Sequence, residues 1–436
     1  MTLFDFFTDP LYRAPFIGSM LMCLSAALMG ALMFVKRGSL LGETLSHATY
    51  PGVMFGALAG ALFFDPASPL SIAVVLGGAF LFAYFGLEVI ERLKVRFRLH
   101  FDAVLCLVLS VSLGLGVVCA SRIQFTDPLR YQQSQVFIYG QAATMTDIHI
   151  LIYGVLSLTV VLFVLYRFRE MELVFFDTLF GTTIGLNVQR SFRGVSLLLI
   201  LSIIVGIRSV GVVLMAGMLI APAAAARSFT DRLSHFLVLS GLFGLLSGFG
   251  GNYLSVKLSA QGLVYPTGPM ILLFAVSITL LSLLFALKRG AVSRLVRISR
   301  FRRRCQSENV LKTLWKEGKE ASHSPAKILQ WNRMNRLRFT RVLFRLKREG
   351  WIDTAAQGKV LLTADGIGRA ERLVRLHRLW ELYLVSCLKV DEERVHYSAE
   401  EMEHILTPDL EARLSKLLNH PKKDPHQKPI PEGEFR

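Results

Sequence analysis

A carboxylate and an imidazole stand four positions apart at several places in this sequence, among them Glu43 with His47 and His377 with Glu381. Residues at this spacing share one face of a helix, and this pair of side chains suits Mn²⁺, Fe²⁺ or Zn²⁺. Glu43 and His47 stand beside and within apolar sequence, where an ionisable group is costly and usually functional. Both pairs are therefore candidate metal ligands, with a plain capping or packing role as the alternative.

A second group of candidate ligands follows the later pair. Its members are His396, Glu400, Glu403 and His404. The run from Ser398 to Glu401 has the form of a capping box and predicts the start of a helix there. On that helix the last three of the group fall at positions i, i+3 and i+4. Histidines and carboxylates on facing helices can form a first-row metal site, although a solvated acidic helix explains the bare pattern equally well.

A stripe of arginines marks a third kind of chemistry. Its members are Arg338, Arg341, Arg345 and Arg348, and the opposite face of the same expected helix carries Phe339, Val342, Leu343 and Leu346. A helix is expected at residues 309–318, a second at 325–331 and the arginine helix at 335–349, with a small hairpin after Gly350. This order is that of a winged helix-turn-helix, whose third helix enters the major groove of DNA. A solvated basic face is the competing interpretation.

The elements that carry these residues differ sharply in composition. Of 436 residues 53% are hydrophobic, and these concentrate in the first two-thirds of the chain, whereas the last third is rich in Arg, Lys and Glu. The net charge of +17 predicts a negatively charged partner, either nucleic acid or anionic lipid headgroups. Five cysteines without a CxxC pair argue against a disulfide framework or a zinc finger.

Apolar runs long enough to cross a bilayer dominate the first part of the chain. Seven clear candidates are residues 15–35, 69–90, 102–120, 148–166, 209–227, 235–256 and 269–287, and two weaker ones are 51–64 and 195–206. The sequence thus predicts eight or nine membrane helices. Lysines and arginines follow several of these runs, most densely at 288–304, and they place those segments and the C-terminal domain in the cytoplasm.

Residues 41–52 resemble the signature of manganese/zinc/iron ABC transporter permeases. They contain Gly42-Glu43-Thr44-Leu45-Ser46-His47-Ala48 and Pro51-Gly52. Residues 172–185 and the run RSVGVVLMAGMLIAPAAAA at 208–226 are similar to the same family, although Glu43 stands where the family usually has Asp. The resemblance implies that Glu43 and His47 line an ion path. It also implies a separate ATPase subunit, a periplasmic or lipoprotein metal-binding protein and a second permease subunit, identical or different. No Walker-type phosphate loop occurs in the chain, and residues 167–193 are the candidate dock for the ATPase.

The segments RLHRLWELYL at 375–384 and VHYSAEEMEHI at 395–405 resemble the diphtheria-toxin-repressor family of metal-dependent repressors. The resemblance implies that His377, Glu381, His396, Glu400, Glu403 and His404 bind a divalent ion. Glu400 falls where manganese-type members have Glu and iron-type members have Cys, and oxygen favours a harder ion. The family's first helix contributes a further ligand near Asn309 and Lys312, and a charged lysine cannot ligate.

The sequence therefore predicts a mostly α-helical chain: a membrane helix bundle at residues 1–288, a basic linker at 289–306, a winged helix at 307–366 and a metal-binding and dimerisation domain at 367–436. The expected function is a permease subunit for manganese or iron(II), with zinc as a further candidate, fused to a metal-dependent repressor that binds a DNA operator. We expect a permease and not an enzyme, with ATP hydrolysis on the separate ATPase subunit. The alternative is a siderophore- or haem-type permease whose cytoplasmic domain senses metal and gates transport without binding DNA.

The expected location is a bacterial inner membrane, where the basic linker also holds anionic lipids. Exposed linkers are frequent sites of proteolysis. Cleavage within residues 288–306 would release the C-terminal domain as a soluble repressor.

Overall fold

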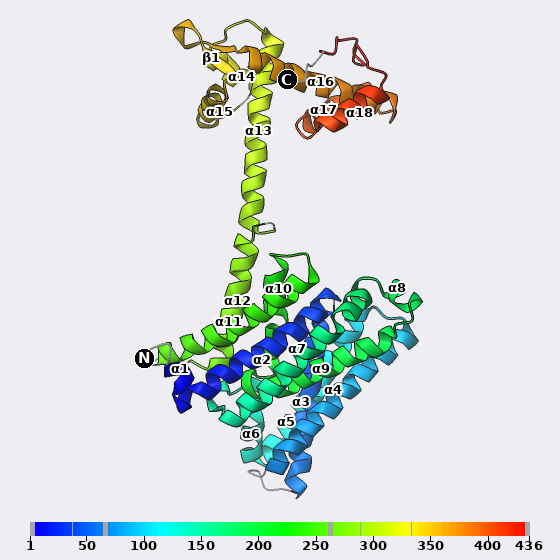
Figure 1. Cartoon of the computed structure of the whole chain (residues 1–436), viewed down its shortest axis with the longest axis vertical. Coiled ribbons are helices and arrows are strands. Elements are labelled where there is room, and N and C mark those ends of the chain that lie inside the picture. Colours follow the sequence, from blue (N-terminus) through cyan, green and yellow to red (C-terminus); the bar gives the residue numbers. More distant parts are fainter. Residues whose placement is uncertain are drawn as a thin grey trace. The chain divides into compact units, whose positions relative to one another are not determined.

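The computed structural model describes residues 5–36, 38–63, 69–259, 265–287, 289–332 and 334–431. Arg37 and Lys288, both in the basic segments considered above, lie outside these ranges, as do residues 432–436. The chain divides into two compact units, Met1–Arg294 and Leu295–Arg436, which we call the membrane unit and the C-terminal unit. Figure 1 shows that both consist almost wholly of helices.

The membrane unit is a bundle of long apolar helices joined by short connections. Its elements are α1 (Asp5–Thr8), α2 (Pro10–Val35), α3 (Ser39–Phe63), α4 (Pro69–Phe97), α5 (Phe101–Thr126), α6 (Pro128–Tyr139), η1 (Ala142–Thr144), α7 (Asp147–Phe176), α8 (Thr178–Thr183), α9 (Val188–Val210), α10 (Val212–Arg227), α11 (Leu233–Ser259) and α12 (Thr267–Phe285). Seven of these, namely α2, α4, α5, α7, α9, α11 and α12, are long and apolar enough to cross a membrane. Helices α3 and α10 pack into the same core and are the other two candidates for the nine expected crossings.

Glycines allow the helices of this unit to approach closely. A Cβ atom at Gly52 of α3 would lie 2.3 Å from the carbonyl oxygen of Gly78 on α4, and one at Gly30 of α2 would lie 1.9 Å from that of Leu219 on α10. Small residues of this kind are typical of packed membrane helices. The positions of α3 and of the residues on it are therefore determined by backbone contact with its neighbours.

The span expected at residues 209–227 is interrupted in the structure. Helix α9 ends at Val210, and α10 begins at Val212 after Gly211, which has φ +92°. A side chain at Gly211 would be strained in this conformation, and its Cβ would lie 2.3 Å from the carbonyl oxygen of Ile138. The unbroken apolar run hid this turn, because hydrophobicity is similar on both sides of it.

The C-terminal unit begins within a long helix and continues as a small α/β domain and a helical bundle. Its elements are α13 (Ala291–Glu317), α14 (Pro325–Asn332), α15 (Arg336–Arg348), β1 (Ile352–Thr354), η2 (Ala356–Gly358), β2 (Val360–Leu362), α16 (Ala364–Ser386), α17 (Glu392–Met402) and α18 (Pro408–Leu417). The expected basic linker at 289–306 is thus mostly helical, as the first half of α13. Helix α17 begins at Glu392, so the capping box expected at Ser398 is wrong: that serine lies inside the helix.

Three helices and a hairpin share one core in the way a winged helix requires. Val310, Leu311 and Leu314 of α13 pack with Ile328 of α14 and with Phe339, Val342 and Leu346 of α15. Strands β1 and β2 pair antiparallel with Ile352 opposite Leu362, and Gly358 adopts φ +71° between them. The order of elements agrees with the winged helix expected from apolar spacing.

Candidate metal-binding sites and nucleic-acid interface

His377, Glu381 and His396 form the clearest candidate metal site. Helix α16 carries the first two one turn apart, and α17 brings the third against them. His377 Nε2 lies 3.1 Å from Glu381 Oε1 and 3.0 Å from His396 Nδ1, and His396 Nδ1 lies 2.9 Å from Glu381 Oε1. Two imidazole nitrogens and one carboxylate oxygen at this spacing fit neighbouring positions around one first-row divalent ion, whose bonds are about 2.1 Å long.

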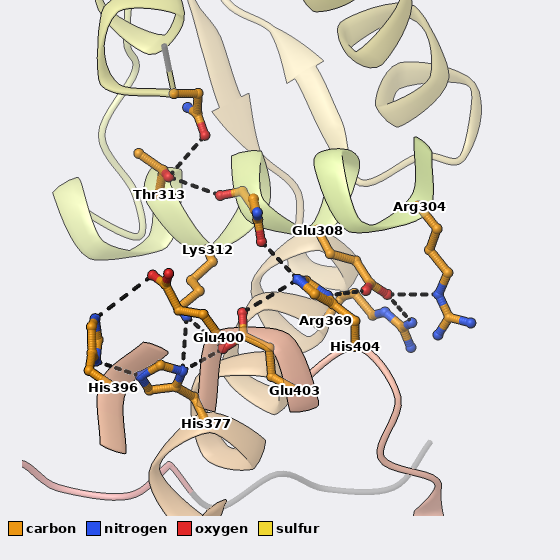
Figure 2. Close-up of polar contacts among 12 residues, drawn as sticks. Arg304, Glu308, Lys312, Thr313, Arg369, His377, His396, Glu400, Glu403 and His404 are labelled. Carbon is orange, nitrogen blue, oxygen red and sulfur yellow. Dashed lines mark hydrogen bonds and ion pairs between the residues drawn. The ribbon is translucent and has the colours of Figure 1, made fainter. Parts of the chain in front are cut away.

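Glu403 and Lys312 fix the orientation of His377 from the Nδ1 side of its ring. Glu403 Oε2 accepts a hydrogen bond of 2.6 Å from His377 Nδ1 and a second of 2.6 Å from the Lys312 ammonium on α13 (Figure 2). Burial lowers the pKa of His377, but hydrogen bonds to Glu381 and Glu403 outweigh burial and raise it. An imidazole that donates its Nδ1 proton to a carboxylate presents Nε2 to a metal ion. Glu403, expected as a ligand, thus supports His377 through this oxygen.

The same glutamate reaches a second cluster through its other oxygen. Glu403 Oε1 is buried, has no hydrogen-bond partner among the described residues, and lies 3.8 Å from His404 Nε2. Asn309 Oδ1 lies 2.9 Å from that nitrogen, and His404 Nδ1 donates a 2.8 Å hydrogen bond to Glu308 Oε2 (Figure 2). His404 Nε2, Asn309 Oδ1 and the unpartnered Glu403 oxygen are donors that fit a second ion, with Glu308 fixing the imidazole.

Glu308 is the site residue that the sequence did not reveal. It is fully buried and accepts hydrogen bonds from His404, Arg369 and Arg304. Burial alone raises the pKa of a carboxyl group, but these three partners outweigh it and lower the pKa of Glu308 to about 2. A lone glutamate after a run of arginines gives no sequence signal for burial, because an exposed acidic residue would look the same.

Glu400 stands at the rim of the first cluster. Its carboxylate is half exposed and lies 3.8 Å from His396 Nε2. At the first-helix position, Asn309 approaches His404, whereas Lys312 contributes a cation in place of a ligand. The six expected ligands therefore fall into two clusters, which Glu403 joins.

The arginine stripe lies on α15 as the spacing predicts. Asn335 caps the helix by accepting from the backbone N–H of Leu337, and the apolar face packs into the core of the winged helix. Arg338, Arg341 and Arg348 are exposed, while Arg345 is half-buried and pairs with Glu349 at 2.8 Å. Gly350, with φ +75°, follows the end of the helix. The exposed guanidinium groups can contact phosphates or the edges of bases.

In the membrane unit, His47 borders a cavity of about 320 Å³. Tyr50 of α3, Gln124 of α5 and Tyr131 of α6 are among the other residues that line it. His47 Nδ1 is buried and has no hydrogen-bond partner among the described residues. Glu43 lies one turn earlier on α3, half-buried, and does not line this cavity. The structure thus brings only His47 of this pair to the cavity.

Comparison with known proteins agrees with this division of the chain. Residues 8–286 match the ABC 3 transport family, and residues 363–432 match the iron dependent repressor, metal binding and dimerisation domain. A probable metal transport system membrane protein of Chlamydia trachomatis is 34% identical over 98% of this chain and 97% of its own length. The manganese transport system membrane protein MntC of Bacillus subtilis is 28% identical over 84% of this chain and 82% of its own.

A solved structure supports the fold of the membrane unit. PsaBC from Streptococcus pneumoniae in complex with Fab matches 68% of this chain and 98% of the compared chain, with 22% identity and a TM-score of 0.56. The family match covers more than half of the sequence, and the Chlamydia relative extends through both units. The chain belongs to the ABC 3 transport family and carries at its C-terminus a domain of the iron-dependent-repressor type.

Proposed function

We propose that this chain is the permease subunit of an ABC importer for a divalent transition-metal ion and that its C-terminal unit is a metal-dependent repressor. The observation that carries the proposal is the cluster of His377, Glu381 and His396 in the unit that follows the membrane helices. Nitrogen and oxygen donors without thiolate favour manganese or iron(II), and zinc remains compatible with them. The manganese relative from Bacillus supports the same choice.

The ion path runs past His47 in this proposal. His47 lines a cavity whose tyrosine and glutamine side chains offer further oxygen atoms, and its buried Nδ1 has no hydrogen-bond partner among the described residues. A buried imidazole nitrogen without a hydrogen-bond partner costs free energy, and a passing metal ion would supply the missing partner. Glu43, one turn away on α3, is the second ligand of the path.

Metal uptake by whole cells tests the path. The chain is co-expressed with the ATPase and binding protein of its own genome in a host that lacks manganese uptake. His47→Ala should abolish uptake, while His235→Ala, a change at an exposed histidine of α11, should not. Normal uptake by correctly inserted His47→Ala protein would remove His47 from the path.

The partners follow from the same proposal. Helix α8 and its flanks expose Leu179, Phe180 and Ile184 within the candidate dock at 167–193, and these apolar side chains suit the surface of an ATPase subunit. Asp177 caps this short helix. A periplasmic or lipoprotein metal-binding protein delivers the ion, a second permease subunit completes the channel, and membrane lipids surround both. The C-terminal unit is cytoplasmic in this arrangement.

The DNA-binding part of the proposal rests on the exposed arginines of α15. The purified chain in detergent micelles should retard DNA from its own promoter when Mn²⁺ is present and not when a chelator is added. The Glu381→Ala protein should fail to retard the DNA whether or not Mn²⁺ is present. Tight binding of Mn²⁺ without any retardation of DNA would favour the alternative, a sensing domain that gates the permease.

A further inference from the structure

A groove of about 830 Å³ lies between α15 and the first half of α13, entirely within the C-terminal unit. Helix α13 forms one wall with Arg302 and Arg303, and the arginine stripe of α15 forms the other. Leu295, Ile298 and Phe344 also border it. Figure 1 shows α15 beside α13, and the residues of α13 that precede the winged helix add arginines to the groove.

The charge in this groove has one sign. None of its lining residues in the described part of the chain is acidic. Arg345 has an acidic partner in Glu349, whereas Arg302 and Arg303 are exposed and form no ion pair with any described acidic side chain. Six guanidinium groups gathered around one groove repel one another unless an anion lies between them. The groove thus fits a ligand with several negative charges.

A recognition helix in the major groove of DNA has one sugar-phosphate backbone on each side, because that groove is only about 12 Å wide. The hairpin β1–β2 packs against α15, as in a winged helix, and α13 forms the far wall of the groove beside α15. A whole duplex cannot enter a space of this volume, but the phosphates of one strand can. We propose that α13 is part of the DNA-binding surface and that Arg302 and Arg303 bind the phosphates of one strand in this groove.

This inference rests on the proposed DNA-binding function and adds to it. Phosphate contacts orient a protein on DNA without reading its sequence. Arg302 and Arg303 would therefore strengthen binding to every duplex alike, while the outward residues of α15 distinguish sequences. The apolar side chains at the edge of the groove can contact deoxyribose and thymine methyl groups.

The salt dependence of binding to a random-sequence duplex tests the inference. The full chain in neutral detergent micelles with Mn²⁺ is titrated by fluorescence anisotropy at several salt concentrations. The slope of log K against log salt is negative, and each lost phosphate contact reduces its magnitude by about 0.9. The variant Arg302→Gln/Arg303→Gln should reduce this magnitude by about 1.8. Arg297→Gln/Arg300→Gln is the matched control, since both residues are equally exposed on α13 but do not line the groove, and its slope should equal that of the native chain.

The outcomes separate this inference from the function on which it rests. A native chain that binds no duplex at any salt concentration overturns both. A native chain that binds, with the same slope for both double variants, overturns only the role of the groove. The titration is then repeated in lipid nanodiscs. An effect of Arg302→Gln/Arg303→Gln that is present in neutral phosphatidylcholine discs and vanishes in anionic phosphatidylglycerol discs would show that lipid headgroups displace DNA from the groove, and it would overturn the DNA-binding role of the groove in an anionic membrane.

Discussion

Lys312 lies where a further metal ligand was expected, and it contributes a buried positive charge instead. Its side chain is nearly buried, and its ammonium lies 2.6 Å from Glu403 Oε2 and 3.2 Å from His377 Nδ1. A buried carboxylate is stable only when a partner compensates its charge. Lys312 therefore keeps Glu403 ionised and in position behind His377. It also attaches α13 to the helices that carry the first ligand cluster.

Lys312→Met should destabilise the C-terminal unit by about 3–5 kcal/mol, because it leaves the Glu403 charge buried and unpaired. All four tryptophans of the chain, at positions 315, 331, 351 and 380, lie in this unit. Urea unfolding followed by tryptophan fluorescence thus reports on it alone. Lys316→Met, one turn later at an exposed position, is the control and should cost less than about 0.5 kcal/mol. Equal stability of the two variants would show that Lys312 has no such role.

Glu308→Gln should weaken Mn²⁺ binding by about 10- to 100-fold, since carboxylates that orient ligating histidines have effects of this size. The amide cannot hold the Nδ1 proton of His404 as the carboxylate does. Isothermal titration of the folded protein measures the affinity. Glu371→Gln, which removes the surface ion pair with Lys319, serves as the control. Unchanged affinity in Glu308→Gln would place His404 and its cluster outside the metal site.

Sequence spacing could predict which helical faces carry ligands but not how the faces meet. The i,i+4 pair of His377 and Glu381 was visible because one helix holds both. The division of the six ligands into two clusters depends on α13 and α17 packing against α16. Contacts between helices do not produce a regular spacing of residue types, so no sign of them was visible in the sequence. Glu308 stayed hidden for the same reason.

At the scale of elements, the crossing of α3 and α4 supports the position of the proposed ion path. Gly52 and Gly78 face each other there: a Cβ on either would lie within 2.5 Å of the other's carbonyl oxygen. No side chain can be inserted without moving one of the helices. Since α3 carries Glu43 and His47, a shift of this helix would displace both.

Gly52→Leu should therefore lower the thermal stability of the detergent-solubilised protein by several degrees and reduce its yield, because the backbones must separate. Overpacking of this kind typically costs about 1–3 kcal/mol. Gly77→Leu is the control, as a Cβ at Gly77 meets nothing within 4 Å. Fluorescence-detected size-exclusion chromatography after heating compares the two. Similar melting of both variants would show that the crossing tolerates separation.

Elements whose apolar residues recur at a regular spacing were predictable from the sequence, and elements without such a spacing were not. The arginine helix and the hairpin appear close to where apolar spacing and Gly358 indicate them. The break at Gly211 and the start of α17 before Ser398 were not predicted. The turn at Gly211 depends on its contact with Ile138, and an apolar run gives no sign of such a contact.

At the scale of the whole molecule, the helix α13 bears on the proposed release of the repressor. The side chains of its first half are mostly exposed, as a cleavable segment requires. Its backbone is helical from Ala291 to Glu317, and proteases act on locally unfolded chain. Release of the C-terminal unit therefore depends on unwinding this helix first.

Val296→Pro should increase release of a soluble C-terminal fragment, because a proline inside a helix costs about 3 kcal/mol and opens the backbone near the arginines. Val296→Ala, which keeps the helix, should behave like the native chain. An antibody against the C-terminus, applied to soluble and membrane fractions at low and high metal, measures the fragment. Finding only full-length protein in membranes for all three would rule out release at this segment.

Helix α13 also joins the end of the membrane unit to the first helix of the winged fold without an interruption in the described chain. Every full-length copy of the permease therefore brings one copy of the sensor, and only cleavage within α13 can change their ratio. A transporter built from two such permeases carries two sensor units in one complex. Where the tethers let the two units meet, their effective concentration is about millimolar, so pairing of the sensors would depend little on how many transporters the cell makes.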